Sequence, residues 1–272
     1  MHKRWCGCVE VNEATVRFLA FACVFSACAV LEACFPRRKR RWPRLRRWVN
    51  HVGIAGVNQL LARVVLPTSA VAVAAYCATE SWGLLNLVNW PGPLEWLVGL
   101  LLLDLAIYGQ HVMFHRVPFF WRFHLMHHAD TDFDVTTGVR FHPLSILFSA
   151  AIKLGVVFVL GPHVLVVVVF EVLLNASSMF NHSNLRIPPQ IDRWLRLVVV
   201  TPDMHRVHHS TDPRETNSNY GFNFPWWDRL FSTYTAQPAS PHEEMALGLS
   251  QFRDGQELHV VRLLTQPFRA RD

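Results

Sequence analysis

The chain has 272 residues, enough for one large domain or two small ones. Hydrophobic residues make up 51% and charged residues 17%, with a mean hydropathy of +0.18, which excludes a disordered chain and is very apolar for a soluble protein. The formal charge of +6 leaves nucleic-acid binders and proteins at an anionic membrane surface as candidate classes. Eight of the 26 Lys and Arg lie in the run RRKRRWPRLRR (37–47), directly after an apolar stretch. This distribution favours a cytoplasmic loop beside a membrane, which meets anionic lipid, and argues against nucleic-acid binding.

Apolar segments follow one another along the chain at a length close to the ~20 residues that a spanning helix needs. They lie at roughly 14–35, 52–79, 91–110, 144–160 and 163–180. The second contains Arg63 and Pro67 and is expected to be partly an interfacial helix, whereas the last two, separated by Gly161-Pro162, fit a tight helical hairpin. The sequence therefore predicts an all-α integral membrane protein with about four or five membrane segments. Because basic loops stay in the cytosol, counting crossings from 37–47 brings every histidine-rich segment to the cytosolic side.

Histidines recur at helical spacing in the second half of the chain. They form one H-x-x-x-H motif and two H-x-x-H-H motifs, made by His111 and His115, by His124, His127 and His128, and by His205, His208 and His209. Positions i, i+3 and i+4 share one face of a helix, so each triplet is expected to aim its imidazoles at one point. Eight imidazoles are too many for one ion with an open position, which predicts two metals. Isolated polar histidines at membrane ends do not explain this phasing.

Two further histidines are weaker candidates for metal ligands. His182 lies in the sequence NHSN at the end of the fifth apolar segment, and His142 lies in RFHP. Asp104 and Tyr108 share a helical stripe with His111 and His115, so we expect both to act on the site by hydrogen-bonding the metal ligands. Thr201 and Pro202 are an N-cap and a first helical residue for the helix that carries the second triplet.

Motifs that the sequence lacks exclude several classes of metal site and enzyme. Glu171 is the only Glu between residues 105 and 210, which excludes a carboxylate-bridged di-iron site of the ferritin type. No H-E-x-x-H zinc-protease helix and no G-x-S-x-G nucleophile motif are present. A histidine-rich pair of metals next to an apolar interior suits oxidation of a lipid C–H bond by dioxygen.

The motif set closely resembles the membrane fatty acid hydroxylase and sterol desaturase superfamily. The matching text is DLAIYGQHVMFH (104–115), WRFHLMHH (121–128), RFHP (140–143), NHSN (181–184), TPDMHRVHHS (201–210) and NYGFNFPWWDRLFSTY (219–234). The resemblance implies a cytosol-facing cap with a non-haem centre of two iron ions, which activates dioxygen with two external electrons and hydroxylates or desaturates a fatty acyl chain or sterol. The metal ligands that it implies are His111, His115, His124, His127, His128, His205, His208 and His209, with His182 and then His142 as further ligands.

The motifs also suggest how the chain is divided and which partners it needs. Residues 1–90 are expected to be N-terminal membrane segments with the basic loop, 91–236 the catalytic domain and 237–272 a tail. No haem-binding H-P-G-G segment and no iron–sulfur Cys set occur, so a separate ferredoxin, cytochrome or reductase is expected to supply electrons. The protein is expected in a bacterial inner membrane, with the endoplasmic reticulum as the alternative. The rival interpretation is a non-oxidative metalloprotein, either a zinc-dependent lipid hydrolase or an inactive metal-binding scaffold, since zinc also accepts imidazole and can load such a site on overexpression.

Three smaller expectations concern the loops around these motifs. The aromatic residues of 219–234, among them Phe222, Trp226, Trp227 and Phe231, either anchor the cap at the lipid headgroups or line the substrate entrance, and anchoring is favoured. Arg140 is expected in a solvated loop. Asp228 and Arg229 are expected to make structural ion pairs to helices of the cap.

Overall fold

The structure, a computed structural model, describes residues 13–66 and 68–270. Every regular element in these residues is a helix, apart from two isolated β-bridges. Five segments of this part of the chain are long and apolar enough to cross a membrane: Glu13–Cys34, Arg44–Leu87, Gly92–Arg116, Pro143–Leu160 and Val164–Asn181. The predicted all-α membrane protein with about four or five membrane segments is confirmed.

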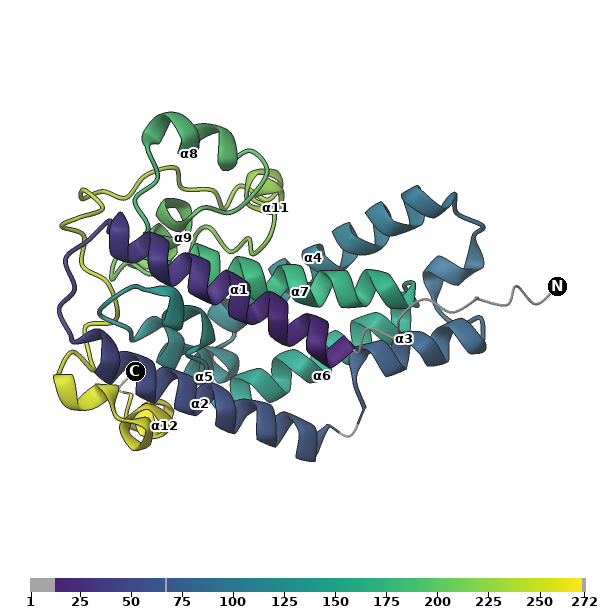
Figure 1. The fold of residues 1–272 in the computed structure, drawn as a ribbon, viewed down its shortest axis with the longest axis horizontal. Helices are drawn as coiled ribbons and strands as arrows, with labels where there is room; N and C mark the ends of the chain where they lie inside the picture. The colour runs from purple at the N-terminus through teal and green to yellow at the C-terminus, as the bar shows by residue number, and fades with distance from the viewer. Residues whose placement is uncertain (1–12, 67, 271–272) are drawn as a thin grey trace.

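The long helices run side by side along the long axis of the molecule (Figure 1). They are α1 (Glu13–Cys34), α2 (Arg44–Val65), α4 (Gly92–Arg116), α6 (Pro143–Leu160) and α7 (Val164–Asn181). The second apolar segment forms two helices. After α2 the chain starts again at α3 (Ala70–Thr79), where the Ser69 hydroxyl accepts a hydrogen bond from the Ala72 amide at 3.1 Å.

The predicted hairpin joins α6 to α7 within three residues. Gly161 ends α6 with φ 59°, and a Cβ there would lie 2.2 Å from the Trp82 carbonyl oxygen, so only glycine fits. His163 then caps α7, because its side chain accepts from the Leu165 amide at 3.2 Å. The tight turn reverses the chain, and both helices pack against α3 and α4.

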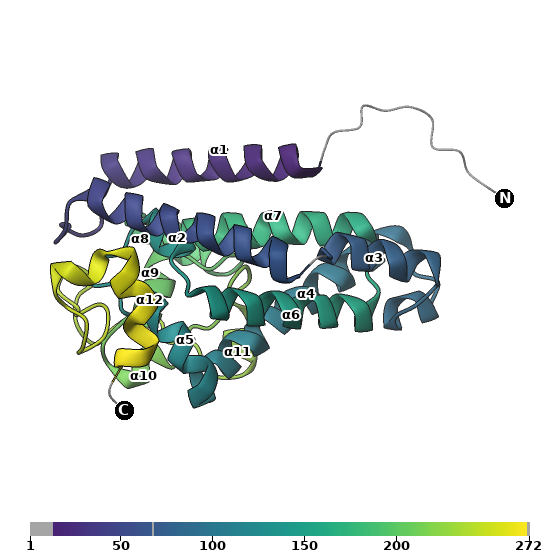
Figure 2. The ribbon, with the colours of Figure 1, turned by 90° about the horizontal axis from the view of Figure 1, so that it is seen from below.

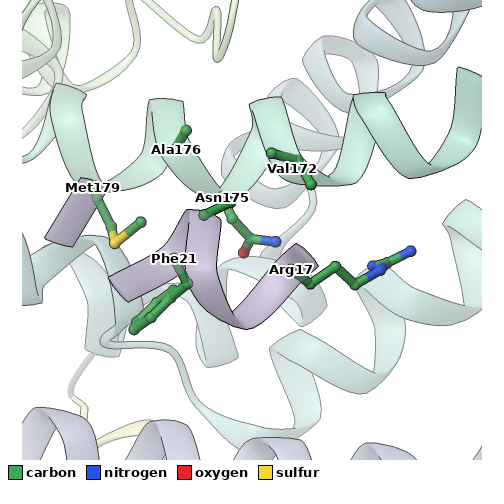
Figure 3. A pocket seen from close by; sticks show the side chains of 7 residues that line it. Arg17, Phe21, Val172, Asn175, Ala176 and Met179 are labelled. Atoms are coloured by element: carbon green, nitrogen blue, oxygen red, sulfur yellow. The ribbon is translucent and has the colours of Figure 1, made fainter. Parts of the chain in front are cut away.

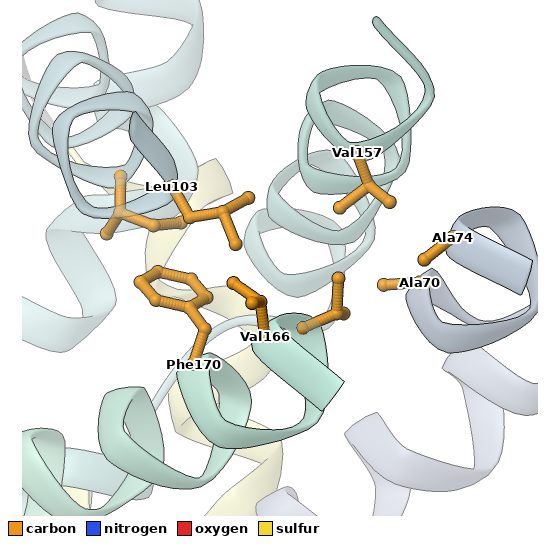
Figure 4. Close-up of a cluster of buried hydrophobic side chains, with 8 residues drawn as sticks. Ala70, Ala74, Leu103, Val157, Val166 and Phe170 are labelled. Carbon is orange, nitrogen blue, oxygen red and sulfur yellow. The ribbon is translucent and has the colours of Figure 1, made fainter. Parts of the chain in front are cut away.

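Helix packing inside the bundle buries a large apolar cluster and brings oppositely charged side chains together. Ala70 and Ala74 of α3 bring that helix close to Leu103, Val166 and other branched residues of α4, α6 and α7, with Phe170 in the same cluster (Figure 4). A small hollow between α1 and α7 is lined by Arg17, Phe21, Met179 and their neighbours (Figure 3), and Arg17 pairs there with Glu171, which also binds Lys153. Pairing of this kind is the expected state of charges at membrane depth.

Shorter helices gather at one end of the bundle and form a cap (Figures 1 and 2). They are α5 (Pro118–His128), α8 (Pro189–Leu195), α9 (Pro202–His208), α10 (Pro213–Thr216), α11 (Trp226–Leu230) and α12 (Val260–Arg269), with the 3₁₀ helices η2 (Val135–Val139) and η3 (Gly255–Leu258); a third, η1 (Leu84–Leu87), precedes α4. The predicted start of α9 is confirmed, since Thr201 caps it and Pro202 is its first residue. Four of the six α-helices of the cap begin with proline, whose fixed φ suits the first helical position.

Residues 37–43 of the basic run form a loop and residues 44–47 begin α2, and several arginines of the run pair with carboxylates. Arg47 is fully buried in α2, and its guanidinium donates to Asp130 Oδ2 at 2.9 Å and to Asp134 Oδ2 at 3.0 Å. Burial alone raises the pKa of Asp130, but Arg47 outweighs it and holds that pKa below its ordinary value. Arg37 binds Asp203 at 3.1 Å in α9. These ion pairs tie α2 and the loop before it to the cap.

Glu32 is the matching buried anion on α1. Its carboxylate accepts from the backbone amides of Val135 and Asn184, each at 3.0 Å, and from Arg44 at 3.1 Å. Arg140, expected in a solvated loop, is instead 1% exposed and lies 3.7 Å from Asp130. The expectation for Arg140 is wrong because the loop after α5 folds back over the end of the bundle rather than into water.

Replacement of Arg47 by methionine tests this buried network. Arg47→Met leaves Asp130 and Asp134 buried without their cation, so we expect the free energy of unfolding to fall by about 3–5 kcal/mol. Unfolding in mixed detergent micelles measures it. Arg46→Met is the control, since Arg46 is exposed and its loss is expected to cost no more than about 0.5 kcal/mol. Equal losses in the two variants would contradict the assignment.

Candidate metal centre

Histidines from four elements meet where the bundle joins the cap. In each of two groups, one nitrogen per residue lies within 4.8 Å of the others. The five-histidine group is His111, His115, His124, His128 and His208, and the four-histidine group is His127, His182, His205 and His209. The structure thus brings together nine of the ten predicted ligands.

Each H-x-x-H-H motif is divided between the two groups. On α5, His124 and His128 enter the five-histidine group while His127 enters the four-histidine group. On α9, His205 and His209 enter the four-histidine group and His208 the other. The expectation that each triplet aims at one point is wrong, because positions i and i+4 stay on one side of the helix while i+3 is rotated toward the neighbouring centre. Both helices therefore bridge the two groups.

More ring nitrogens converge than hydrogen bonds among them can satisfy. His182 Nε2 lies 3.1 Å from His127 Nε2, 3.1 Å from His205 Nε2 and 3.2 Å from His209 Nε2. A neutral imidazole has one N–H, so these nitrogens cannot all be satisfied by one another. Buried ring nitrogens with no hydrogen-bond partner also occur on His115, His124, His128, His205 and His209. Convergent, unsatisfied neutral nitrogens fit metal cations, and within the described residues no carboxylate joins either group.

Backbone carbonyls hold several rings by the nitrogen on the other side. His111 Nδ1 lies 2.8 Å from the Tyr220 carbonyl oxygen, and His208 Nδ1 lies 2.7 Å from that of Ser218. His127 Nδ1 lies 3.2 Å from the Arg140 carbonyl oxygen, and His182 Nδ1 lies 2.6 Å from that of Ser178. A carbonyl accepts only from an N–H, so each contact sets the tautomer that leaves Nε2 free to bind a metal.

The electrostatic environment keeps these histidines neutral. Burial, followed by the neighbouring imidazoles, lowers the pKa of His127, His128, His205 and His209 well below the ordinary value, and burial lowers the pKa of His182 to about 4. Neutral imidazole is the form that binds a metal ion. The cluster is therefore ready to bind cations at neutral pH without first losing protons.

Three other predicted residues lie outside the two groups. The Asp104 carboxylate accepts from Trp227 Nε1 and from Asn223 Nδ2, each at 2.8 Å, and no hydrogen bond joins it to a histidine of the described chain. The Tyr108 hydroxyl meets Thr233 Oγ1 at 2.9 Å. His142 caps α6 by accepting from the Leu144 amide at 3.2 Å. Asp104 thus fastens the segment after the second triplet to α4, and His142 has a structural contact of its own.

A residue that the sequence did not single out for the site organises this segment. Asp228 is fully buried and accepts from the amides of Tyr220 and Gly221, each at 2.8 Å. A Cβ on Gly221 would lie 2.7 Å from Asp228 Oδ2, so glycine is needed for this approach. The carboxylate fixes the residue whose carbonyl receives His111. Asp228 and Arg229 were expected to make ion pairs to helices of the cap, but both bind the backbone instead. Asp228 accepts from the two amides, and Arg229 donates to the Arg196 carbonyl at 2.8 Å.

The profile of the family described as fatty acid hydroxylase matches residues 96–233, just over half of the chain. The chain belongs to this family. Every histidine of the two groups falls inside the matched region.

Relatives of this fatty acid hydroxylase family member come from bacteria and animals. It is 31% identical over 152 residues to an ornithine lipid hydroxylase of Rhizobium tropici, covering 55% of this chain and 44% of the relative. It is 29% identical over 171 residues to an alkylglycerol monooxygenase of Homo sapiens, covering 63% of this chain and 36% of the relative. A cholesterol 25-hydroxylase of Rattus norvegicus is 27% identical over 282 residues, with 94% and 89% covered. The chain thus spans less than half of the first two relatives, and no solved structure matches it.

Substitution of Gly221 tests how Asp228 positions His111. In Gly221→Ala the new Cβ displaces the carboxylate and tilts the Tyr220 carbonyl, so we expect ferrous iron to bind about 10–100-fold more weakly, as when other supports of metal ligands are lost. Titration of the metal-free protein with ferrous iron measures this. Gly109→Ala is the matched control, because Gly109 lies on α4 near His111 and its added Cβ meets nothing within 4 Å. Unchanged iron affinity in Gly221→Ala would refute the positioning.

The lowered pKa values also predict a pH dependence for the metal-free protein. Below about pH 6.5 the histidines of the unfolded chain bind protons, whereas the buried histidines of the folded protein stay neutral. As the pH decreases, the free energy of unfolding therefore falls by up to about 1.4 kcal/mol per pH unit for each histidine. Asp228, whose pKa burial raises to about 6, opposes this with a single proton. We expect a lower melting temperature at about pH 5.5 than at about pH 7.5. The same melting temperature at both would show that the histidines do not stay neutral.

Proposed function

We propose that the protein is a membrane-bound non-haem di-iron oxygenase that oxidises a C–H bond of a lipid with dioxygen and external electrons. The observation that carries this is the pair of converging, buried groups of neutral histidines with no carboxylate among them. The printed names of the relatives support it, since they describe hydroxylases and monooxygenases of ornithine lipid, alkylglycerol and cholesterol. Those names favour hydroxylation over desaturation, and a substrate with a polar group and a hydrocarbon part.

The residues have separate tasks in this proposal. Each histidine group holds one iron ion, and the irons supply the reduction of dioxygen and the oxidation of the substrate. The chain keeps the imidazoles neutral, excludes water by burial and orients the rings through backbone carbonyls. Asp104 and Tyr108 act on the centre indirectly, through the segment that carries Asn223, Trp227 and Thr233.

Phe222 lies between the apolar core of the bundle and both histidine groups. Its ring is 5.9 Å from that of His111 and 6.2 Å from that of His205, one from each group, and it also packs against the apolar core of the bundle. Asn181 holds the Phe222 carbonyl at 2.7 Å. This ring is the apolar boundary between bundle and metals, so we propose that the hydrocarbon part of the lipid reaches the irons beside it.

The cap is proposed to face the cytosol, because the basic run lies at this end of the bundle. A separate ferredoxin, cytochrome or reductase supplies the electrons there, and a bacterial inner membrane is favoured over the endoplasmic reticulum. A zinc-dependent lipid hydrolase is less favoured, since neither group includes a carboxylate to activate water.

Growth of the native host under oxygen-18 gas tests the function, by comparing lipids from cells that carry the wild type or His127→Ala. A lipid that gains labelled oxygen only with the wild type shows hydroxylation and names the substrate, whereas unlabelled loss of two hydrogens shows desaturation. His259→Ala is the control, since His259 is exposed and outside both groups. If no lipid differs between the wild type and His127→Ala, the result favours the non-oxidative metalloprotein.

A further inference from the structure

Two of the four tyrosines of the chain lie beside the histidine groups. Tyr220 is fully buried, and its ring centroid is 5.7 Å from that of His111, 5.2 Å from His115 and 5.6 Å from His208. Tyr108 on α4 is 5% exposed, and its ring lies 6.3 Å from that of Tyr220. An unbroken series of aromatic contacts therefore leads from three metal ligands to Tyr108.

Tyr108 has a route for its phenolic proton. Thr233 Oγ1 donates to Asp228 Oδ1 at 2.7 Å, which uses its only hydrogen. The Tyr108 hydroxyl, 2.9 Å from the same Thr233 oxygen, must then be the donor in that contact. The phenol is thus linked through one hydroxyl to a buried carboxylate that can accept a proton.

Tyr220 lacks such a route. Its hydroxyl donates to the side-chain oxygen of Asn217 at 3.2 Å, and an amide oxygen is not a base at neutral pH. A phenol is much easier to oxidise when its proton can leave at the same time. The two tyrosines are therefore different: Tyr220 provides a ring in contact with the ligands, and Tyr108 provides the group that can be oxidised.

The outer side of Tyr108 is close to the surface. Phe231 stacks on it with ring centroids 5.5 Å apart and is itself 52% exposed. An oxidised Tyr108 is one ring away from external reductants, whereas the histidine groups are enclosed.

We propose that Tyr108, reached through the ring of Tyr220, is an electron donor that reduces the oxidised metal centre when no lipid is in place to be oxidised. This tyrosine relay rests on the proposed oxygenase function, in which dioxygen is the oxidant. Tyr108 loses one electron to the centre, its proton moves to the Thr233 oxygen, and the Thr233 proton moves to Asp228. A neutral tyrosyl radical remains until an external reductant returns one electron and the proton held by Asp228 returns through Thr233 to the Tyr108 oxygen. The relay protects the buried ligands from their own oxidant.

Freeze-quench electron paramagnetic resonance tests the relay on the full chain in detergent, loaded with ferrous iron and mixed with dioxygen without lipid. We expect an organic radical that narrows when the protein is made with ring-deuterated tyrosine. Tyr108→Phe is expected to abolish it, Thr233→Val to diminish it, and Tyr220→Phe, which keeps the ring, to retain it. Tyr76→Phe is the matched control, because Tyr76 is 56% exposed on α3 at the other end of the bundle.

Each other outcome counts against the relay. Oxidation of the ferrous centre with no radical in the wild type would overturn it, as would an equal signal in Tyr108→Phe. A ferrous centre that dioxygen does not oxidise would instead refute the proposed function and the relay with it. Repeated exposure to dioxygen adds a second measure, since Tyr108→Phe is expected to lose iron-binding capacity sooner than Tyr76→Phe.

Discussion

Nine imidazoles, eight of them buried, can share one space only while they stay neutral and while each ring is held in a fixed orientation. Burial provides the first condition, since it lowers the pKa of the cap histidines well below the pH of a cell. Carbonyl acceptors from separate parts of the chain, such as those of Ser178 and Ser218, provide the second. Much of the cap can be understood as the scaffold that places these acceptors, which is why its short helices are linked by side-chain contacts rather than by a sheet.

Charged groups do this linking where the bundle meets the cap. Arg47 crosses from α2 to Asp130 and Asp134, and Glu32 of α1 reaches the backbone of Val135 and Asn184. Asn184 is two residues beyond His182, and Asp130 is two residues beyond His128. The ion pairs therefore fix the ends of the helices that carry the clustered histidines. Buried pairs contribute little net stability compared with an apolar core, but they allow one geometry, which a metal centre requires.

The segment 219–234 shows how one stretch of chain can serve several purposes. Its Phe222 ring contacts both histidine groups and the apolar core, its Trp227 fastens it to Asp104, and its Asp228 sets the Tyr220 peptide. The sequence suggested an aromatic anchor at the headgroups. Trp226 and Phe231 are indeed exposed, but Phe222 and Trp227 face inward, because their partners on α4 and at the end of α7 draw this segment against the bundle.

The sequence alone determined the class of fold and the kind of site, because both depend on local periodicity. Apolar length predicts spanning helices, and histidines at i, i+3 and i+4 predict ligands on a helix face. Local periodicity cannot show how a helix is rotated toward two neighbours at once, so the division of His124, His127 and His128 between two groups came only from packing. The same holds for Arg47, Arg140 and Asp228, whose burial depends on residues far away along the chain. From sequence alone a charged residue is expected in solvent, because the partner that allows its burial is distant in the chain and is brought near only by the tertiary structure.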